Sequence, residues 1–393
     1  MNASVTSSSA AAGAADAIYM DSALALAVRG VALASPNPLV GAVLVREGRV
    51  VGEGFHTYDG VRHAEVIALE AAGESARGAT LYINLEPCCH TGRTGPCTQA
   101  LIAAGVAHVV AAMADPNPAV AGRGFKQLRE AGIEVTTGLR EAEARRMNET
   151  FAHWIVSRKP LVTLKSALTL DGQLVLPKAQ GSARKGARIS QRHRWISSPE
   201  SRAEVQRMRH ASDALLTGIG TVLVDDPLLT DRTDLPRRRK LLRVVLDSRL
   251  RLPLRSKLVR SANGDVLIFT RASEASPKAR ALRRAGVEVA RLPGRGSKPG
   301  LAEAIAELGR RQILSVILEA GAILNSAALA AGIVDKMRVF FAPKIAGFAE
   351  KQPGAATATK RIQAVQELKD IEFERFGPDL AIEGYLRDVY RTR

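Results

Sequence analysis

Cysteine, aromatic residues and long apolar runs are all scarce in this sequence. The three cysteines lie close together, at Cys88, Cys89 and Cys97, which argues for metal binding or catalysis and against a disulfide framework. Aromatic residues make up 4% of the chain, too few for the surfaces on which single-stranded nucleic acids stack. No apolar run reaches the roughly 18 residues of a membrane span, and the N-terminal stretch lacks the basic and apolar regions of a signal peptide. We therefore expect a cytoplasmic protein that binds neither nucleic acid nor a membrane.

The net charge is strongly positive, at +17 for 393 residues. Such a charge invites the hypothesis of a nucleic-acid-binding protein. The basic residues are spread over the whole chain, however, and arginines also suit a small phosphorylated substrate. Apolar residues at 46% and charged residues at 24% are typical of a folded globular protein. The charge by itself therefore does not indicate nucleic acid.

The length and the order of elements predict two α/β domains that meet near residues 158–160. We expect a flexible tail at 1–17, a first domain at 18–158 and a second at 159–393, because the alternation of strands and helices restarts after Pro160. In the first domain we predict helices at 16–34, 63–72, 97–104, 124–131 and, as one long helix, 139–157, with strands at 39–45, 50–55, 79–87, 106–113 and 132–136. In the second we predict strands beginning at 160 and at 213–218, 241–247, 265–270, 287–292, 313–319 and 337–343.

A metal-ligand pattern in the first domain indicates the reaction that this domain catalyses. His63 opens a predicted helix and Glu65 follows two residues later, while Cys88 and Cys97 flank a turn-rich loop. A histidine followed by this glutamate, and then by a proline-cysteine pair, is typical of zinc-dependent deaminases. One imidazole and two thiolates leave a fourth position on Zn2+ for water, and the glutamate moves the protons without binding the metal. The pattern predicts hydrolytic deamination.

Three alternatives fit part of this pattern. A structural zinc site would recruit His90 as the fourth ligand and would leave Glu65 without a role. A tRNA or nucleoside deaminase with an unrelated C-terminal half would keep two residues between the cysteines, whereas eight separate Cys88 from Cys97. A nucleic-acid-binding protein with structural zinc would bind DNA or RNA with an affinity that falls steeply with salt.

The motifs of both halves, taken in order, resemble one family. HAEVIAL, LEPCCHTGRTGPC and DPNPAVAGRG in the first half are followed by LKSALTLDG, RWISSPESR, GIGTVLVDDPLLTDR, VVLDS, LEAGAIL and FFAPKIAG in the second. Together with PNPLVGAVLV near the N-terminus, they resemble the bifunctional deaminase/reductase of riboflavin biosynthesis. The resemblance spans about residues 18–387. It implies a cytidine-deaminase-like three-layer α/β/α domain followed by a dihydrofolate-reductase-like α/β domain.

The same resemblance implies two reactions and a set of substrate contacts. The first domain would deaminate a diaminopyrimidinone that carries a ribose 5-phosphate, and the second would use NADPH to reduce the ribosyl group to ribityl. Asn37, His56 and Arg93 fall where the family contacts the pyrimidine and its phosphate. Two simpler interpretations stay open, since His56 also fits a strand-end histidine without a ligand and Asn37 fits a turn residue before Pro38. We also expect a homo-oligomer.

Without the resemblance, the function of the second half is ambiguous. Gly321 follows a predicted strand and precedes a predicted helix, which suits a phosphate at a helix N-terminus, but the three-glycine dinucleotide fingerprint is absent. By resemblance, NADPH is lined by Ala167, Trp195, Thr221, Asp225, Ser248, Gly321, Ala322, Ile323, Leu324, Asn325, Ser326 and Ala327. Likewise by resemblance, the substrate is faced by His193, Arg209, Leu229, Arg232 and Glu319.

The chain departs from the family between Asp171 and Trp195. Residues 172–199 contain six basic residues and no acidic one, and His193 stands where the family usually has serine. The basic segment 178–194 fits either a solvated loop or a clamp on a substrate or cofactor phosphate. Lys165 fits either the proton donor of the reduction or a solvated strand residue.

Overall fold

The computed structural model describes residues 4–174, 195–293, 300–347 and 365–390. The chain forms two compact units. The first contains Met1–Ser157 and Pro236–Arg239, and the second contains Arg158–Leu235 and Lys240–Arg391. His193 and the basic segment 178–194 lie outside the described residues. None of the described helices combines the length and apolar character needed to cross a bilayer.

The first unit is built on a five-stranded sheet with the strand order β2-β1-β3-β4-β5. The strands are β1 (Gly41–Arg46), β2 (Arg49–Phe55), β3 (Thr80–Ile83), β4 (His108–Ala111) and β5 (Glu134–Thr137). β1 runs antiparallel to β2 and β3, and β4 runs parallel to β3 and β5. The predicted strands of this half are therefore confirmed, although several are shorter than expected.

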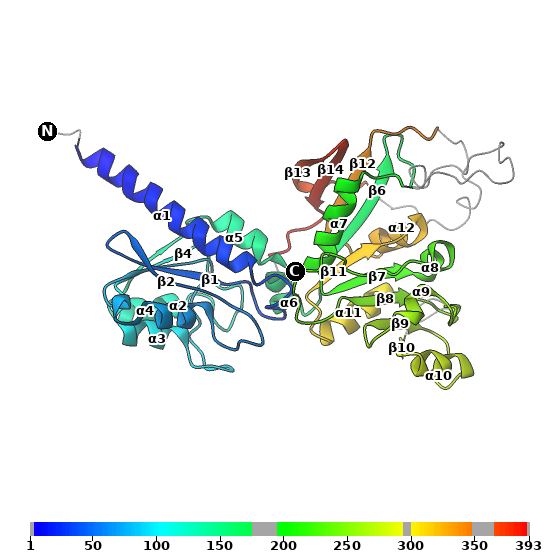
Figure 1. The fold of residues 1–393 in the computed structure, drawn as a ribbon, viewed down its shortest axis with the longest axis horizontal. Helices are drawn as coiled ribbons and strands as arrows, with labels where there is room; N and C mark the ends of the chain where they lie inside the picture. The colour runs from blue at the N-terminus through cyan, green and yellow to red at the C-terminus, as the bar shows by residue number, and fades with distance from the viewer. Residues whose placement is uncertain (1–3, 175–194, 294–299, 348–364, 391–393) are drawn as a thin grey trace. The chain divides into compact units, whose positions relative to one another are not determined.

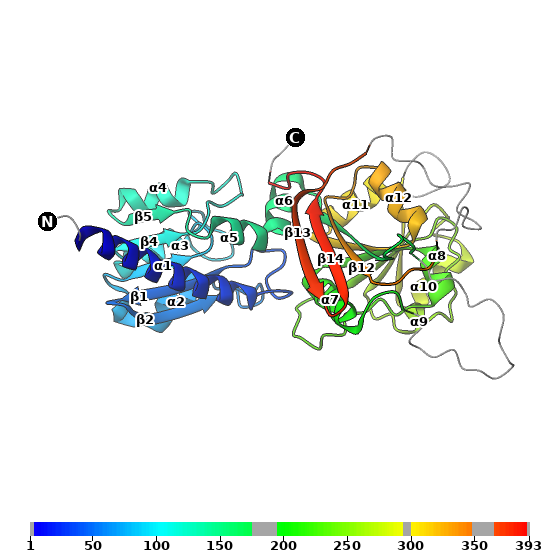
Figure 2. The ribbon, with the colours of Figure 1, turned by 90° about the horizontal axis from the view of Figure 1, so that it is seen from above.

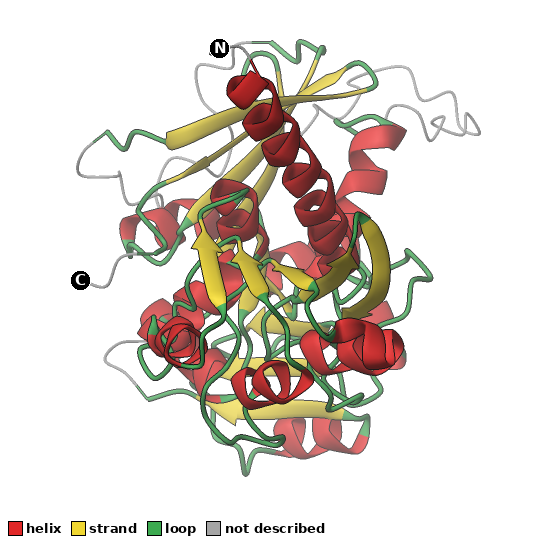
Figure 3. Ribbon diagram, turned by 90° about the vertical axis from the view of Figure 1, so that its left-hand side faces the viewer, coloured by secondary structure: helices red, strands yellow, loops and turns green. Residues whose placement is uncertain are grey.

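Helices cover both faces of this sheet (Figure 1). They are α1 (Ser4–Val28), α2 (Ala64–Ala72), α3 (Cys97–Ala104), α4 (Arg123–Glu130), α5 (Glu141–Met147) and α6 (Glu149–Ser157), with a short 3-10 turn, η1 (Gly73–Ala76). Side chains alternate along β1, so that Ala42 and Leu44 belong to the core beneath α2, α3 and α4, whereas Val43 and Val45 belong to the core beneath α1 and α5. Figure 3 shows α1 as the long helix nearest the N-terminus.

Two predictions for the first unit are wrong in detail. The first helix, expected at 16–34, begins at Ser4 and ends at Val28. The stretch expected to be one helix at 139–157 is divided into α5 and α6 by Asn148. The Asn148 side chain is buried and pairs with the backbone of Leu39, accepting from its N–H at 2.8 Å and donating to its carbonyl at 2.9 Å. This pairing fixes the break between the two helices.

The second unit contains a nine-stranded sheet with the order β10-β9-β8-β7-β11-β6-β12-β14-β13. Its strands are β6 (Leu161–Thr169), β7 (Ala214–Gly218), β8 (Leu242–Leu246), β9 (Val266–Thr270), β10 (Val287–Arg291), β11 (Ser315–Glu319), β12 (Lys336–Ala342), β13 (Lys369–Phe376) and β14 (Asp379–Tyr385). All neighbours are parallel except those of β14. The strands predicted from the sequence are confirmed, whereas β13 and β14 were not predicted.

Six helices of the described residues complete this unit. They are α7 (Pro199–Ala211), α8 (Ile219–Asp225), α9 (Lys257–Arg260), α10 (Pro277–Arg284), α11 (Leu301–Arg310) and α12 (Ala322–Ala330). One apolar core contains side chains of α11 and α12, and a second contains side chains of α8, α9 and α10. Figure 2 shows the β13–β14 hairpin at one edge of the sheet. Both faces of the central parallel strands are therefore covered, as their continuous apolar runs require.

Candidate active sites

The close approach of α2 to β2 positions the first site. A Cβ atom at Gly52 would lie 2.1 Å from the carbonyl oxygen of Ala68, and one at Gly54 would lie 2.3 Å from that of Ala64. Two glycines on one face of the strand therefore let the helix backbone rest directly on the sheet. His63 is the residue that immediately precedes α2, and Glu65 lies in its first turn. The packing thus brings both residues to the start of the helix.

His63, Cys88 and Cys97 form the potential metal-binding cluster found among the described residues. The Nδ1 atom of His63 lies 3.1 Å from the Cys97 Sγ and 3.5 Å from the Cys88 Sγ. One nitrogen and two sulfur donors at such distances fit the ligand preferences of zinc. His90 is exposed and is not part of this cluster. The alternative of a structural site with His90 as fourth ligand is therefore not supported by the geometry.

Glu65 is enclosed by the same cluster. It is only 3% exposed, and burial, together with the charge of Cys88, raises the pKa of its carboxyl group to about 7. Hydrogen bonding from Cys97, and secondarily from His63, lowers the pKa of Cys88 against the opposing effect of burial. The site therefore holds a thiolate ready to bind a cation and a carboxyl group able to exchange a proton near neutral pH.

Asn37 and His56 are brought to the same place. His56 Nδ1 lies 2.9 Å from the carbonyl oxygen of Arg62, which only accepts, so its Nε2 accepts from the Asn37 amide at 2.9 Å. Burial lowers the pKa of His56, and its ring packs edge-on against His63 with a centroid separation of 5.3 Å. His56 is thus a buried, hydrogen-bonded neighbour of the metal-binding cluster. The Asn37 amide is held in one orientation by this pairing.

Arg93 extends from the loop between Cys88 and Cys97. It donates to the carbonyl oxygen of Tyr58 at 2.9 Å, and its guanidinium lies 4.4 Å from the centroid of the Tyr58 ring. The Arg238 guanidinium, which belongs to the same compact unit, lies 3.7 Å from that centroid. Neither Tyr58 nor Arg238 was singled out from the sequence, because no motif surrounds them. Two guanidinium groups at the half-buried Tyr58 ring, one of them also paired with Asp59, make the surroundings of this ring cationic and suitable for an anionic group.

The second site lies at the carboxyl edge of β7 and β11. These strands are parallel neighbours, and each is followed at once by a helix, α8 after Gly218 and α12 after Gly321. A Cβ at Gly218 would lie 3.3 Å from Leu324, so the two helix starts are close together. The residues predicted to line NADPH on these helices are Thr221 and Asp225 on α8 and Ala322 to Ala327 on α12. A helix N-terminus at this edge is where α/β proteins bind phosphates.

Two buried polar atoms at this edge lack partners. Among the described residues, nothing forms a hydrogen bond with the hydroxyl oxygen of Thr217 or with the amide oxygen of Asn325. The Asn325 amide nitrogen, in contrast, donates to the Ala320 carbonyl at 3.2 Å. Buried polar atoms without partners are rare in folded proteins and commonly mark a ligand site. A dinucleotide carries amide, hydroxyl and phosphate groups that can satisfy such atoms, so the residues present fit NADPH.

Three of the predicted NADPH residues lie in other segments. Ala167 is on β6 opposite Phe340 of β12, and Ser248 follows β8. Trp195 is 53% exposed, and its carbonyl accepts from the Lys344 Nζ at 2.7 Å. The Arg202 guanidinium lies 5.3 Å from the centroid of the Trp195 ring. The predicted contact at Trp195 stays a prediction.

Arg209, Glu319 and Lys165 form a charged cluster beside this edge. Arg209 on α7 donates two hydrogen bonds to the Glu319 carboxylate, from Nε to Oε1 at 2.6 Å and from a terminal guanidinium nitrogen to Oε2 at 3.0 Å. Burial would raise the pKa of Glu319, but Arg209 outweighs it and holds that pKa below its usual value. Lys165 is paired with Glu319 in the register of β6 and β11. Lys165 is half-buried, and burial lowers the pKa of its ammonium group.

Leu229 and Arg232 lie on the loop that follows α8. Leu229 has a positive φ of 58° and is buried in the core, so its backbone is the part able to face a ligand. Arg232 is exposed, and its charge contributes to the lowered pKa of Glu319, which places it near the charged cluster. The structure therefore gathers all the described residues that were expected to face the reductase substrate. His193 lies outside the described residues.

The fold and the two sites define a class of protein. A buried carboxyl group beside one imidazole and two thiolates is the arrangement of zinc-dependent hydrolytic deaminases. A cation-rich cluster beside a helix N-terminus, at the carboxyl edge of parallel strands, is typical of α/β enzymes that bind nucleotides and phosphorylated substrates. The chain is therefore a two-domain enzyme with a hydrolytic deaminase in its first half and a nucleotide-dependent enzyme in its second.

Comparisons with known proteins identify the family. Residues 14–113 match the cytidine and deoxycytidylate deaminase zinc-binding region, and residues 160–382 match the RibD C-terminal domain. The chain is 39% identical to the riboflavin biosynthesis protein RibD of Escherichia coli over 381 residues, which cover 93% of this chain and 98% of that protein. The same-named protein of Actinobacillus pleuropneumoniae is also 39% identical, with 94% of each chain covered.

Solved structures agree with these matches. The structure resembles that of a diaminohydroxyphosphoribosylaminopyrimidine deaminase/5-amino-6-(5-phosphoribosylamino)uracil reductase from Thermotoga maritima, with a TM-score of 0.78, 33% identity and coverage of 95% of this chain and 99% of that one. Acinetobacter baumannii RibD gives a TM-score of 0.76 at 34% identity with the same coverage. The chain belongs to the RibD family, the bifunctional deaminase/reductases of riboflavin biosynthesis. The predicted fold class, function and cofactors, Zn2+ and NADPH, are confirmed.

Proposed function

We propose that residues 18–158 deaminate a diaminopyrimidinone ribose 5-phosphate, hereafter the ribotide, and that residues 159–393 reduce the product with NADPH. The observation that best supports the proposed deaminase activity is the burial of Glu65 beside His63, Cys88 and Cys97. A carboxyl group is costly to bury without a partner, and its position beside a metal-binding cluster supports a role in proton transfer. We assign the three cluster residues as the zinc ligands.

The side chains of the first site divide the work of deamination. Zinc, when bound, supplies the Lewis-acid chemistry that makes water nucleophilic at neutral pH. Glu65 accepts a proton from the attacking water at its carboxylate and delivers it to the departing amine, so that ammonia leaves and a carbonyl remains. Asn37, oriented by His56, contacts the pyrimidine edge. Arg93 contacts the phosphate, since its guanidinium lies at the exposed rim of the site.

Selective removal of zinc tests this division. Chelation of zinc from the full chain should abolish deamination of the ribotide, because the attacking water is activated by the metal ion and not by its ligands. NADPH oxidation with the already deaminated ribotide should continue at an unchanged rate, since the assigned ligands all belong to the first unit. Restoring zinc should restore deamination. Loss of both activities in parallel would contradict the assignment of the metal to one reaction.

In the second unit, NADPH lies at the carboxyl edge of β7 and β11. We assign Ala167, Trp195, Thr221, Asp225, Ser248 and Gly321 to Ala327 to the cofactor, and His193, Arg209, Leu229, Arg232 and Glu319 to the substrate. Hydride transfer is the chemistry of the cofactor, so the protein has to hold the nicotinamide against the sugar carbon. Arg209 is already hydrogen-bonded to Glu319. We therefore assign this pair to orienting the substrate and Arg232 to binding its phosphate.

Lys165 is our candidate for the proton donor of the reduction. Burial, and secondarily the charge of Arg209, lowers the pKa of its ammonium group against the opposing effect of Glu319, which favours release of its proton. Lys165→Met keeps the length of the side chain and should lower kcat for reduction by about 100-fold, the lower end of the usual effect of losing an acid or base catalyst. Deamination by the same variant serves as its control. A kcat for reduction within a factor of two of that of the unmodified chain would exclude this role.

We further propose that the enzyme works in the cytoplasm as a homo-oligomer and binds no nucleic acid. The edge strand β13 and its partner β14 expose Phe373 (65%), Ile371 (48%) and Leu380 (43%). Exposed apolar side chains on an edge hairpin are often covered in soluble proteins, and a second copy of the chain is the simplest cover. Sedimentation velocity of the full chain tests this, and a strictly monomeric species at micromolar concentration would contradict it.

A further inference from the structure

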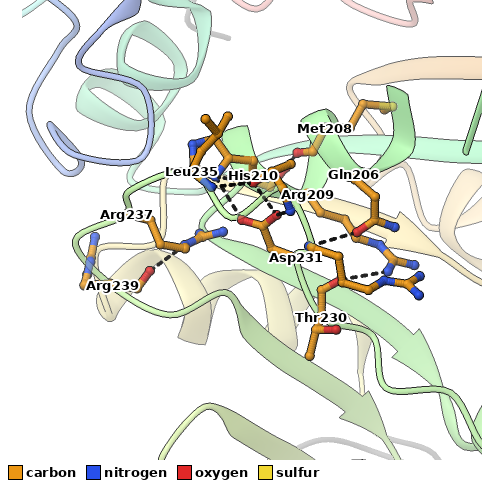
Figure 4. Close-up of polar contacts among 12 residues, drawn as sticks. Gln206, Met208, Arg209, His210, Thr230, Asp231, Leu235, Arg237 and Arg239 are labelled. Carbon is orange, nitrogen blue, oxygen red and sulfur yellow. Dashed lines mark hydrogen bonds and ion pairs between the residues drawn. The ribbon is translucent and has the colours of Figure 1, made fainter. Parts of the chain in front are cut away.

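A buried cluster next to Arg209 has no role in the assignments above. His210 on α7 is 6% exposed, and its Nδ1 lies 2.9 Å from the Asp231 Oδ2. The Thr233 hydroxyl donates to the other carboxylate oxygen of Asp231 at 2.8 Å and lies 3.3 Å from the same His210 nitrogen. Figure 4 shows His210 beside Asp231. Because the carboxylate and the hydroxyl meet the same ring nitrogen, the three residues cannot form a proton relay of the Ser-His-Asp type.

The cluster fixes a loop rather than a reacting group. Three residues of α7 hold the loop 229–233, as Figure 4 also shows. The Gln206 Oε1 accepts from the Arg232 backbone N–H at 3.1 Å, Arg209 donates to the Thr230 carbonyl at 3.0 Å, and His210 binds Asp231. The backbone N–H of Thr233 also donates to the Asp231 carboxylate, at 3.0 Å. The loop is therefore tied to the helix that also carries Arg209.

Within this loop, the Arg232 side chain is the charged group that remains available to bind a ligand. The Arg232 side chain is exposed, and none of the described residues accepts a hydrogen bond from its guanidinium. The Asp231 side chain on one side of it is occupied by His210 and Thr233, and the Thr230 carbonyl on the other side is occupied by Arg209. The orientation of the Arg232 backbone is thus set by contacts from α7, while its guanidinium stays available for an anion.

We propose that His210 is a positioning residue of the reductase: through Asp231 it holds the loop 229–233 so that Arg232 meets the phosphate of the substrate. The inference rests on the proposed contact between Arg232 and that phosphate. Asp231 is the link, since its carboxylate joins His210 of the helix to the backbone and the hydroxyl of Thr233 in the loop. A binding group that is held by packed neighbours loses less entropy when the ligand arrives, so its contribution appears in substrate affinity.

The test compares three variants of the full chain in the reduction of the deaminated ribotide. Arg232→Ala should raise the KM for the ribotide about 10- to 100-fold, the usual effect of losing a charge-assisted hydrogen bond. His210→Leu should raise it about 5- to 10-fold, with kcat and the KM for NADPH unchanged, because the group it positions is displaced but still present. His210→Asn should stay near the unmodified chain, since its amide nitrogen can donate to Asp231 as Nδ1 does.

A double mutant separates positioning from general support of the fold. If His210 acts through Arg232, His210→Leu should add nothing to the KM of Arg232→Ala, whereas independent effects would multiply. Ser212→Ala is the matched control, because it removes a hydrogen bond to the Met208 carbonyl at the same end of α7. Should His210→Leu fail to fold, Thr233→Val, which keeps the side-chain shape, should raise the KM in the same way.

The outcomes distinguish failure of the proposed contact between Arg232 and the phosphate from failure of the inference about His210. An unchanged KM in Arg232→Ala would overturn the proposed phosphate contact and this inference with it. A raised KM in Arg232→Ala combined with an unchanged KM in folded His210→Leu would overturn the inference alone. A full multiplication of the two effects in the double mutant would also overturn it.

Discussion

Replacement of Glu65 by glutamine is expected to lower the rate of deamination by about 100- to 10,000-fold while zinc stays bound. The amide has the size of the carboxylate but cannot accept a proton from the attacking water. The zinc ligands are other side chains, so metal content should not fall. Release of ammonia from the ribotide gives the rate, and metal analysis of the same sample gives the zinc content.

Glu70→Gln is the matched control for this prediction. It makes the same chemical change on the same helix, but Glu70 is exposed and paired with Arg62 rather than enclosed by the cluster. Its deamination rate should stay close to that of the unmodified chain. Near-normal deamination by Glu65→Gln at full zinc occupancy would show that another group moves the protons.

Exchange of Cys88 or Cys97 for serine is expected to remove zinc and to abolish deamination, whereas Cys89→Ser should keep both. Either of the first two changes leaves only two protein ligands of the assigned set, too few for a stable site. The Cys89 thiol does not belong to the cluster formed by His63, Cys88 and Cys97. Zinc content per chain and the deamination rate are measured on each purified variant.

Reduction provides the internal control for the cysteine variants. All three should oxidise NADPH normally with the deaminated ribotide, because the assigned NADPH and substrate positions are in the second unit. Loss of zinc in Cys89→Ser, with retention in Cys88→Ser, would mean that the wrong cysteine has been assigned.

The metal-binding cluster was predictable because its residues belong to short motifs. His63 and Glu65 are two residues apart at a helix start, a spacing that the chemistry itself requires, and the cysteines are concentrated in one loop. The central parallel strands were predictable for a related reason, since buried strands read as continuous apolar runs such as those of β9 and β11.

Other features depend on contacts between distant residues. Asn148 divides a helical pattern because its side chain pairs with Leu39, more than a hundred positions earlier. β13 was not predicted because seven of its eight residues are exposed, so it has no buried apolar run. The link between His210 and Asp231 joins residues of a helix and a later loop, and although Asp231 lies in the motif GIGTVLVDDPLLTDR, His210 lies in none of the motifs and nothing in the sequence specifies the pairing.

One measurement tests most directly whether a single chain carries both reactions. The purified zinc-loaded chain is incubated with the ribotide, with and without NADPH, and ammonia, NADPH and both pyrimidine products are followed over time. Without NADPH, we predict ammonia release and accumulation of the deaminated ribotide alone. With NADPH, the reduced product should appear after the deaminated one, with one NADPH oxidised for each molecule formed. NADPH oxidation without prior ammonia release, or ammonia release with no reduction of the deaminated product, would contradict the account.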